Sequence, residues 1–116
     1  MTYVLLIYRA THAPDAPADR RSLAAHRALQ GEAAARGELH AVARLDDAPA
    51  AKTVRGRGGG AHEVTDGPYI ESKEWLVGFY LLDCSGEAEA LDRARTLCAD
   101  DNHAIEVRPA LWHRGP

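Results

Sequence analysis

The sequence predicts an α+β fold in which two helices cover one face of an antiparallel sheet. Two apolar runs, residues 3–8 and 76–83, have the length and composition of buried strands. Residues 18–36 and 85–99 instead repeat apolar side chains every three to four positions, as helices do. The predicted elements follow the order strand, helix, strand, short hairpin, strand, helix, strand, which is a ferredoxin-like arrangement.

The first half of the chain begins with a strand and a long helix. The run YVLLIY at residues 3–8 is apolar throughout, so we expect a central strand buried on both faces. Two prolines make residues 11–17 a predicted loop. The helix predicted over residues 18–36 contains Gly31, which weakens it by about 1 kcal/mol, and Gly37 is placed to end it.

The middle of the chain predicts a strand followed by a small hairpin. Residues 38–45 alternate between apolar and polar side chains, which is typical of a half-buried strand. Short strands are predicted at residues 51–55 and 62–65. The run Gly58–Gly60 between them can adopt positive φ angles and suits a tight turn. These glycines lack the spacing of a phosphate-binding loop and precede a strand rather than a helix.

The second half predicts a turn, a strand, a helix and a final strand. Asp66-Gly67-Pro68 is a turn signal, and residues 70–75 are predicted to be irregular or a short helical turn. Gly78 in the apolar strand indicates a bend or a close backbone approach. Ser85 is a candidate N-cap for the second helix, and residues 104–108 alternate as a strand that ends at a proline.

Composition and charge limit the class of protein. The 116 residues suffice for one core, so we expect a single domain over residues 1–116, and a hydrophobic content of 46% argues against disorder. The net charge of −3 argues against nucleic acid as a partner. No apolar run is long enough to span a membrane, and the first strand has no signal-peptide features. We therefore expect a cytoplasmic protein, with Cys84 and Cys98 as buried thiols rather than a disulfide.

The predicted sheet has an uncovered face. If both helices lie on one face, the other face stays partly apolar and in contact with water. An exposed apolar face favours a partner, and the simplest partner is a second copy of the chain. The fold class therefore predicts a homodimer.

Two segments in the second half resemble a known signature. Residues 64–74 read VTDGPYIESKE, and residues 78–82 read GFYLL. They resemble the DGPF-type group of YCII-related proteins, whose usual pattern is V-T-D-G-P-F-x-E-T-K-E before a strand G-G-[FY]-[YF]-x-[IL]. The first strand and the final strand, IEVRP at residues 105–109, are also similar, so the resemblance covers nearly the whole chain. The departures are Tyr69 for Phe, Ser72 for Thr and Val77 for Gly.

The resemblance implies a dimeric α/β barrel, in which the ferredoxin-like sheets of two chains pack face to face. It implies less about activity, because its members include uncharacterised proteins, proteins linked to sigma factors and a dehydrochlorinase of an aromatic ring. In YciI-like relatives a histidine on the first helix, paired with an aspartate, is the proposed acid–base site. His26 lies at the matching distance before Gly37, where DGPF members often carry an aromatic residue, and Asp66 is our candidate for its partner.

The candidate site residues also have structural interpretations. His26 suits a general acid or base, because the unperturbed pKa of histidine lies near 6.5, but it could instead pack in the core against a backbone carbonyl. Asp66 would orient His26 or bind substrate, or its carboxylate could cap its own turn. Tyr69, Glu71 and Lys73 are predicted to bind substrate at a cavity rim. Core packing is the alternative for Tyr69, and solvated ion pairs are the alternative for the other two.

The sequence predicts neither a metal nor a cofactor. The remaining histidines show no i, i+4 pair typical of a helical zinc site, and the cysteines match no zinc pattern. A nucleotide-binding fingerprint and a serine nucleophile elbow are also absent.

Two functions from different classes are compatible with the sequence. The first is a cofactor-free lyase, isomerase or cyclase for a small organic molecule, with His26 moving a proton and Asp66 orienting it or binding substrate. The second is a non-catalytic dimerising or ligand-sensing module, linked to transcription regulation through protein contacts, which rests on analogy with the relatives linked to sigma factors.

Overall fold

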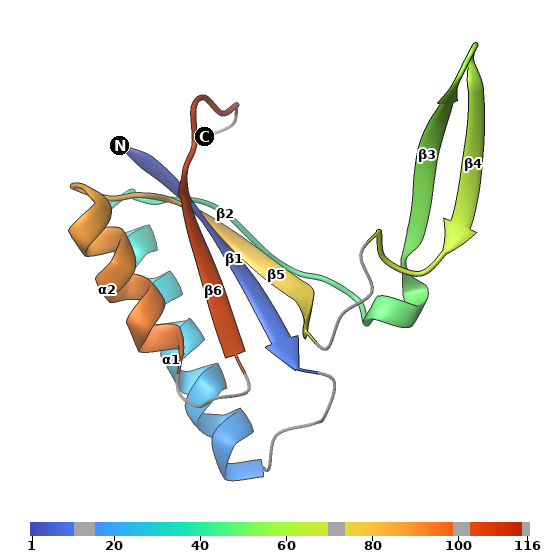
Figure 1. Ribbon diagram of the computed structural model, residues 1–116. Helices are drawn as coiled ribbons and strands as arrows, with labels where there is room; N and C mark the ends of the chain where they lie inside the picture. Colours follow the sequence, from blue (N-terminus) through green and yellow to red (C-terminus); the bar gives the residue numbers. More distant parts are fainter. Residues whose placement is uncertain (11–15, 70–73, 99–102, 115–116) are drawn as a thin grey trace.

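The computed structural model describes residues 1–10, 16–69, 74–98 and 103–114, and it confirms the α+β class (Figure 1). The strands β2, β5, β1 and β6 form an antiparallel sheet in that spatial order, and β3 pairs with β4 in a separate hairpin. The elements are β1 (Thr2–Ala10), α1 (Ala16–Ala35), β2 (Leu39–Arg44), the 3-10 turn η1 (Ala48–Ala50), β3 (Lys52–Gly58), β4 (Ala61–Asp66), β5 (Glu74–Asp83), α2 (Glu87–Leu97) and β6 (His103–Pro109).

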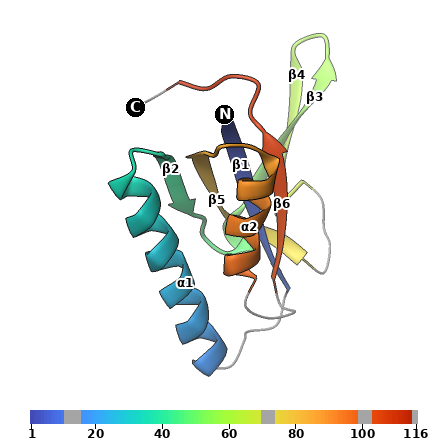
Figure 2. The ribbon, with the colours of Figure 1, turned by 90° about the vertical axis from the view of Figure 1, so that its left-hand side faces the viewer.

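Both helices cover the same face of the four-stranded sheet, as predicted (Figures 1 and 2). Alternate side chains of a strand point to opposite faces, and one set from β1 and β5 packs beneath the helices. The buried core consists of Tyr3, Leu5, Ile7, Leu29, Ala33, Tyr80, Leu82, Cys84, Ala90, Ala94 and Leu97.

In the described parts of the chain no helix is both long enough and apolar enough to cross a bilayer.

The opposite face of the sheet is open in the single chain. The prediction that β1 is buried on both faces is therefore wrong for one chain, because Val4, Leu6 and Tyr8 are only half-buried. Leu6 pairs with Phe79 of β5, which is also half-buried. The open face thus carries an apolar patch along the two central strands.

The predicted glycine-rich hairpin is confirmed. Strands β3 and β4 are joined through Gly59 and Gly60, whose φ angles of 57° and 82° are both positive, as a two-residue hairpin turn requires. The hairpin extends away from the main sheet (Figure 1), and its Val54 and Val64 are each 65% exposed. The radius of gyration is accordingly 16.0 Å, compared with about 13.4 Å for a globular chain of this length.

The starts of α1 and β5 differ from the predictions. Helix α1 begins at Ala16 rather than at residue 18, so Pro17 lies in the helix and not in a loop. Proline is tolerated in the first turn because amide groups there have no partner within the helix. The sequence predicts an irregular segment up to Trp75. Strand β5 instead begins at Glu74, because Glu74 and Trp75 both pair with β1.

The ends of α2 also differ from the predictions. The N-cap is Gly86 rather than Ser85, whose backbone N–H donates to Glu89 Oε1 at 3.1 Å. The helix ends at Leu97, so Cys98 is exposed and the prediction of two buried thiols holds only for Cys84. Neither cysteine forms a disulfide in the described part of the chain.

Arg93 is a buried charge that joins α2 to the ends of two other elements. Its side chain lies 2.6 Å from Glu38 Oε1, just before β2, and donates to the backbone carbonyl of Asp83 at 2.9 Å. Arg93 is 7% exposed, and a buried guanidinium needs such partners because its desolvation is costly. These contacts fix α2 against the end of the sheet where β5 finishes and β2 begins.

The predicted close approach at Gly78 is confirmed. A Cβ atom built on Gly78 would lie 2.6 Å from the backbone oxygen of Ala43 on β2. The pairing register of β5 with β1 also shifts beside this residue, between Ile7 and Tyr8. A side chain at Gly78 would therefore push β2 away from β5.

We predict that Gly78→Ala destabilises the protein by about 1–3 kcal/mol through overpacking. Gly31→Ala on α1 is the matched control, because a Cβ atom at Gly31 would meet no atom outside the helix within 4 Å. It should stabilise by about 0.5–1 kcal/mol, since alanine favours helix. Urea unfolding of both variants at one protein concentration measures the difference. Equal stability of the two variants would contradict the steric role of Gly78.

Candidate functional site

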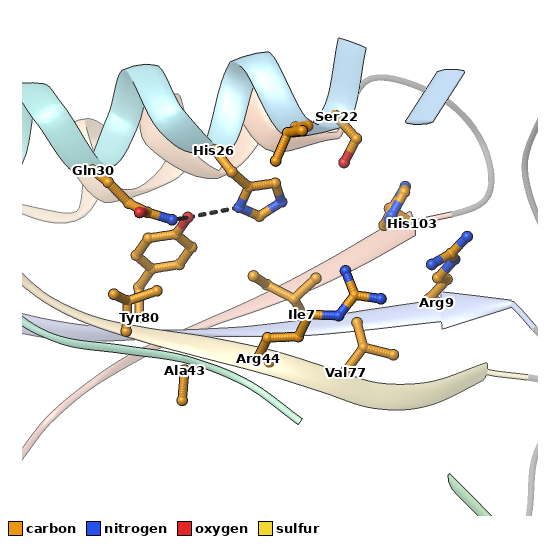
Figure 3. A pocket seen from close by; sticks show the side chains of 13 residues that line it. Ile7, Arg9, Ser22, His26, Gln30, Ala43, Arg44, Val77, Tyr80 and His103 are labelled. Atoms are coloured by element: carbon orange, nitrogen blue, oxygen red, sulfur yellow. Dashed lines mark hydrogen bonds between the residues drawn. The ribbon is translucent and has the colours of Figure 1, made fainter. Parts of the chain in front are cut away.

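A cavity of about 570 Å³ lies between α1 and the sheet (Figure 3). Its helical wall comes from the middle of α1, residues 22–30, and its floor comes from β1, β2, β5 and the start of β6. This volume is within the usual range for small-molecule sites. The lining residues are Ile7, Arg9, Ser22, Leu23, His26, Gln30, Val42, Ala43, Arg44, Val77, Gly78, Tyr80 and His103.

A hydrogen-bonded group of three side chains forms one wall of the cavity. His26 Nδ1 lies 2.6 Å from the hydroxyl of Tyr80, and Gln30 Nε2 donates to the same hydroxyl at 3.1 Å (Figure 3). The rings of His26 and Tyr80 are nearly parallel, with 11° between their planes. His26 and Gln30 are four residues apart on α1 and therefore share a face of the helix. Tyr80, on the central strand β5, is 1% exposed.

The hydrogen bonds favour one tautomer of His26. Tyr80 has one hydroxyl proton, and its oxygen already accepts a hydrogen bond from Gln30. The arrangement that satisfies all three groups has Tyr80 donating to Nδ1 of a neutral imidazole. A neutral imidazole with an accepting Nδ1 carries its proton on Nε2. His26 therefore presents an Nε2–H donor to the cavity.

Burial and nearby positive charge keep His26 neutral. Desolvation lowers the pKa of His26 below 6.5, and the charges of His103 and Arg44 lower it further. Desolvation also raises the pKa of Tyr80 above 10.0, although the hydrogen bond from Gln30 opposes this shift. At neutral pH both groups of the pair are therefore uncharged.

The opposite side of the cavity is rich in positive charge. Arg9 of β1 and Arg44 of β2 both line it, and His103 lies at the start of β6. Among the described residues no aspartate or glutamate lines the cavity. Guanidinium groups bind carboxylates and phosphates through paired N–H donors. The arrangement can therefore accept a small anionic molecule beside the imidazole of His26.

The predicted partner of His26 lies elsewhere in the chain. Asp66 ends β4 in the projecting hairpin, and its carboxylate pairs with Lys52 of β3. Tyr69 is 67% exposed and lies beneath the guanidinium of Arg55, 4.9 Å from the ring centroid, so it neither packs in the core nor lines the cavity. Glu71 and Lys73 lie outside the described residues.

Sequence reasoning selected His26 but missed the residues that the fold places around it. In the sequence Tyr80 is one residue of an apolar strand, although its hydroxyl requires a partner when buried. Gln30, four residues after His26 on the same helix face, is a usable signal for that partner. Nothing in the sequence marks Arg9 and Arg44 as cavity residues, because arginines at strand ends are ordinarily solvated.

We predict that protonation of His26 opposes folding in mildly acidic solution. Its pKa is about 6.5 in the unfolded chain and lower in the folded chain. Between these two values the unfolded state binds more protons. The stabilisation from His26 is thus fully present above pH 6.5 and is lost as the pH falls through the folded pKa. Urea unfolding across this range should show a steeper pH dependence for the wild type than for His26→Gln.

The tautomer of His26 gives a second prediction. Two-bond ¹H–¹⁵N correlation spectra above pH 7 should show the proton on Nε2, with the signal assigned by its loss in His26→Gln. A proton on Nδ1 would instead make Nε2 an acceptor and reverse the role of the imidazole.

His103→Gln should raise the pKa of His26 in the same spectra, because it removes a neighbouring positive charge.

Comparison with known proteins identifies the family. The model of the YCII-related domain matches residues 1–111. The chain is also 40% identical, over 121 residues, to "Uncharacterized protein R00369" of Rhizobium meliloti (strain 1021), with 99% of this chain and 97% of the relative covered. Together with the ferredoxin-like fold, these matches show that the chain belongs to the family of YCII-related domain proteins.

Proposed function

We propose that this protein is a cofactor-free lyase, isomerase or cyclase that acts on a small organic carboxylate. The observation that carries the proposal is the 2.6 Å contact between His26 Nδ1 and the Tyr80 hydroxyl at the wall of a cavity. This contact holds the imidazole in one orientation, and preorganised proton donors are a large source of catalytic power. A single domain over residues 1–116 acting in the cytoplasm stays part of the proposal.

In this proposal His26 is the proton donor. Its Nε2–H would bind the carbonyl oxygen of the substrate and stabilise the negative charge that develops on that oxygen as an adjacent C–H bond breaks. A neutral imidazole suits this role when its pKa is lowered, as that of His26 is. Tyr80 stays bonded to Nδ1, because its hydroxyl donates to that nitrogen whether Nε2 keeps its proton or shares it with the substrate oxygen.

The remaining cavity residues complete the reaction. His103 lines the same cavity, and in its neutral form it would receive the proton from carbon. Returning that proton to another carbon is an isomerisation, and expelling a leaving group from the neighbouring carbon is an elimination. Arg9 and Arg44 would hold the substrate carboxylate. Asp66 does not contact His26 within one chain, so the proposal gives it no part in orienting the imidazole. Substrate binding by Asp66, Tyr69, Glu71 and Lys73 remains a prediction.

We also propose that the protein is a homodimer in which two open sheet faces pack together as a dimeric α/β barrel. The proposal is supported by the half-buried apolar side chains Val4, Leu6 and Phe79 on the face that the helices leave open. Apolar surface of this kind is typical of an interface. The hairpin, with Val54 and Val64 exposed, offers a second apolar surface to the partner.

A ligand-sensing module is the second candidate function, because the cationic cavity could bind an anion without transforming it. The two functions differ in one respect that can be measured. A sensor would bind the anion equally well after loss of proton transfer, and its effect would pass through protein contacts that do not need His26.

The enzymatic proposal predicts hydrogen exchange at carbon. The wild-type protein, incubated in D₂O with small 2-oxo and 3-oxo carboxylic acids, should speed deuterium incorporation next to the carbonyl group, as followed by ¹H NMR. His26→Ala should slow this exchange by about 100- to 10,000-fold, the usual contribution of a positioned acid or base. His62→Ala, on the exposed hairpin, is the histidine control and should leave the rate unchanged.

Unchanged exchange in His26→Ala, with circular dichroism showing a folded protein, would remove the proposed role of His26. Binding of the same acids to the wild type without exchange would favour the sensor.

The dimer proposal predicts the effect of a charge on the open face. Leu6→Glu places a carboxylate in the apolar patch, so sedimentation equilibrium should show a monomer where the wild type is a dimer. Ala28→Glu, on the exposed side of α1, is the control and should remain dimeric. A monomeric wild type at micromolar concentration would contradict the proposal.

A further inference from the structure

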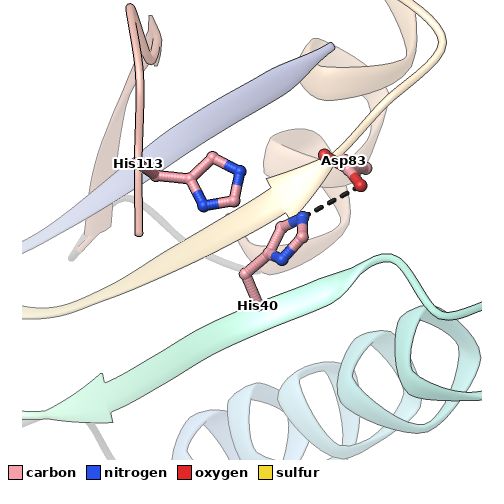
Figure 4. Close-up of side chains that lie close together, drawn as sticks. All are labelled: His40, Asp83 and His113. Atoms are coloured by element: carbon pink, nitrogen blue, oxygen red, sulfur yellow. Dashed lines mark ion pairs between the residues drawn. The ribbon is translucent and has the colours of Figure 1, made fainter. Parts of the chain in front are cut away.

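A second cluster of polar side chains lies at the end of the sheet where β5 finishes (Figure 4). His40 comes from β2, Asp83 from the last position of β5, and His113 from the C-terminal tail. One ligand atom from each of the three lies within 4.8 Å of the others. The cluster shares no residue with the cavity around His26.

The carboxylate is held in place from both sides. Asp83 Oδ1 accepts a hydrogen bond from the hydroxyl of Thr2 at 2.7 Å, and Oδ2 lies 2.9 Å from His40 Nε2. A second residue that orients a ligating carboxylate in this way is typical of metal sites.

The tail histidine points inward although it lies outside regular structure. The ring centroids of His113 and His40 are 4.4 Å apart. Among the described residues the buried Nδ1 of His113 has no hydrogen-bond partner, whereas buried polar atoms normally have one. The neighbouring tail residues Leu111 and Trp112 are 96% and 75% exposed. The tail thus half-buries a polar ring and leaves its two large apolar side chains exposed.

We propose that His40, Asp83 and His113 form a binding site for a divalent transition metal, with Zn²⁺ the ion that the ligand set fits best. Two imidazoles and one carboxylate are a common three-ligand set for Zn²⁺, which leaves the fourth position open to water or a further ligand. Their nitrogen and oxygen donors also suit Co²⁺ and Fe²⁺ but fit Mg²⁺ and Ca²⁺ poorly, because these ions prefer oxygen ligands.

Closing the site around an ion needs only a small movement. Ligand atoms at about 2.1 Å from a tetrahedral Zn²⁺ lie roughly 3.4 Å apart, so the widest separation of 4.8 Å must shorten by somewhat more than 1 Å. Rotation of the His113 side chain, together with its tail, can supply that change. The bound ion would then fasten the C-terminal tail to β2 and β5.

Metal binding to the full-length, metal-free protein tests the proposal. Titration with Co²⁺ should give the visible absorption of a tetrahedral complex, saturating at one ion per chain, and Zn²⁺ should displace it. His113→Gln and Asp83→Asn should each weaken binding by at least tenfold. Thr2→Val, which removes only the hydroxyl that orients Asp83, should weaken it by about 10- to 100-fold.

Two controls separate this site from adventitious binding. His62→Gln, on the exposed hairpin, and Cys98→Ser, at the end of α2, remove other exposed metal ligands and should leave the affinity and stoichiometry unchanged. His113 lies outside every helix and strand, so His113→Gln should retain the circular dichroism of the wild type. Absence of Co²⁺ and Zn²⁺ binding, or binding that persists in His113→Gln and Asp83→Asn, would overturn the proposal.

Discussion

The hydroxyl of Tyr80 is the constraint on which the arrangement of α1 over the sheet depends. The ring of Tyr80 lies in the core, 1% exposed, so its hydroxyl must find partners inside the protein. His26 and Gln30 supply them from adjacent turns of α1. An unpaired buried hydroxyl costs about 1–3 kcal/mol, which favours this one placement of the helix. The same contacts orient the imidazole, so the fold and the candidate site share a single interaction.

The two ends of the helical layer differ in how tightly they pack on the sheet. Where β5 finishes, the buried Arg93 ties α2 to Glu38 and to the backbone of Asp83. Beneath residues 22–30 of α1 a cavity remains, because the side chains there do not fill the space above Val77 and Gly78. Packing thus seals one end of the domain and leaves the other open to a ligand.

The two faces of the sheet carry different chemistry. The cavity on the helical face collects arginine and histidine side chains, which suits an anion. The opposite face presents an apolar patch and, at its end, the carboxylate of Asp83 between two histidines. Alternation along the strands separates the two sets, because Leu82 points into the core while its neighbour Asp83 points the other way.

The secondary structure, the ferredoxin-like order, the glycine hairpin and the place of His26 on the first helix could be predicted from the amino-acid sequence, because these depend on periodicity and on local backbone preference. The contacts of His26 could not: Tyr80 takes the place expected for Asp66, which pairs with Lys52 instead. The sequence also could not predict which strand ends line the cavity, or that His40, Asp83 and His113 lie close together. Such contacts join residues far apart in the chain, and only the packing of helices on the sheet and the path of the tail determine them.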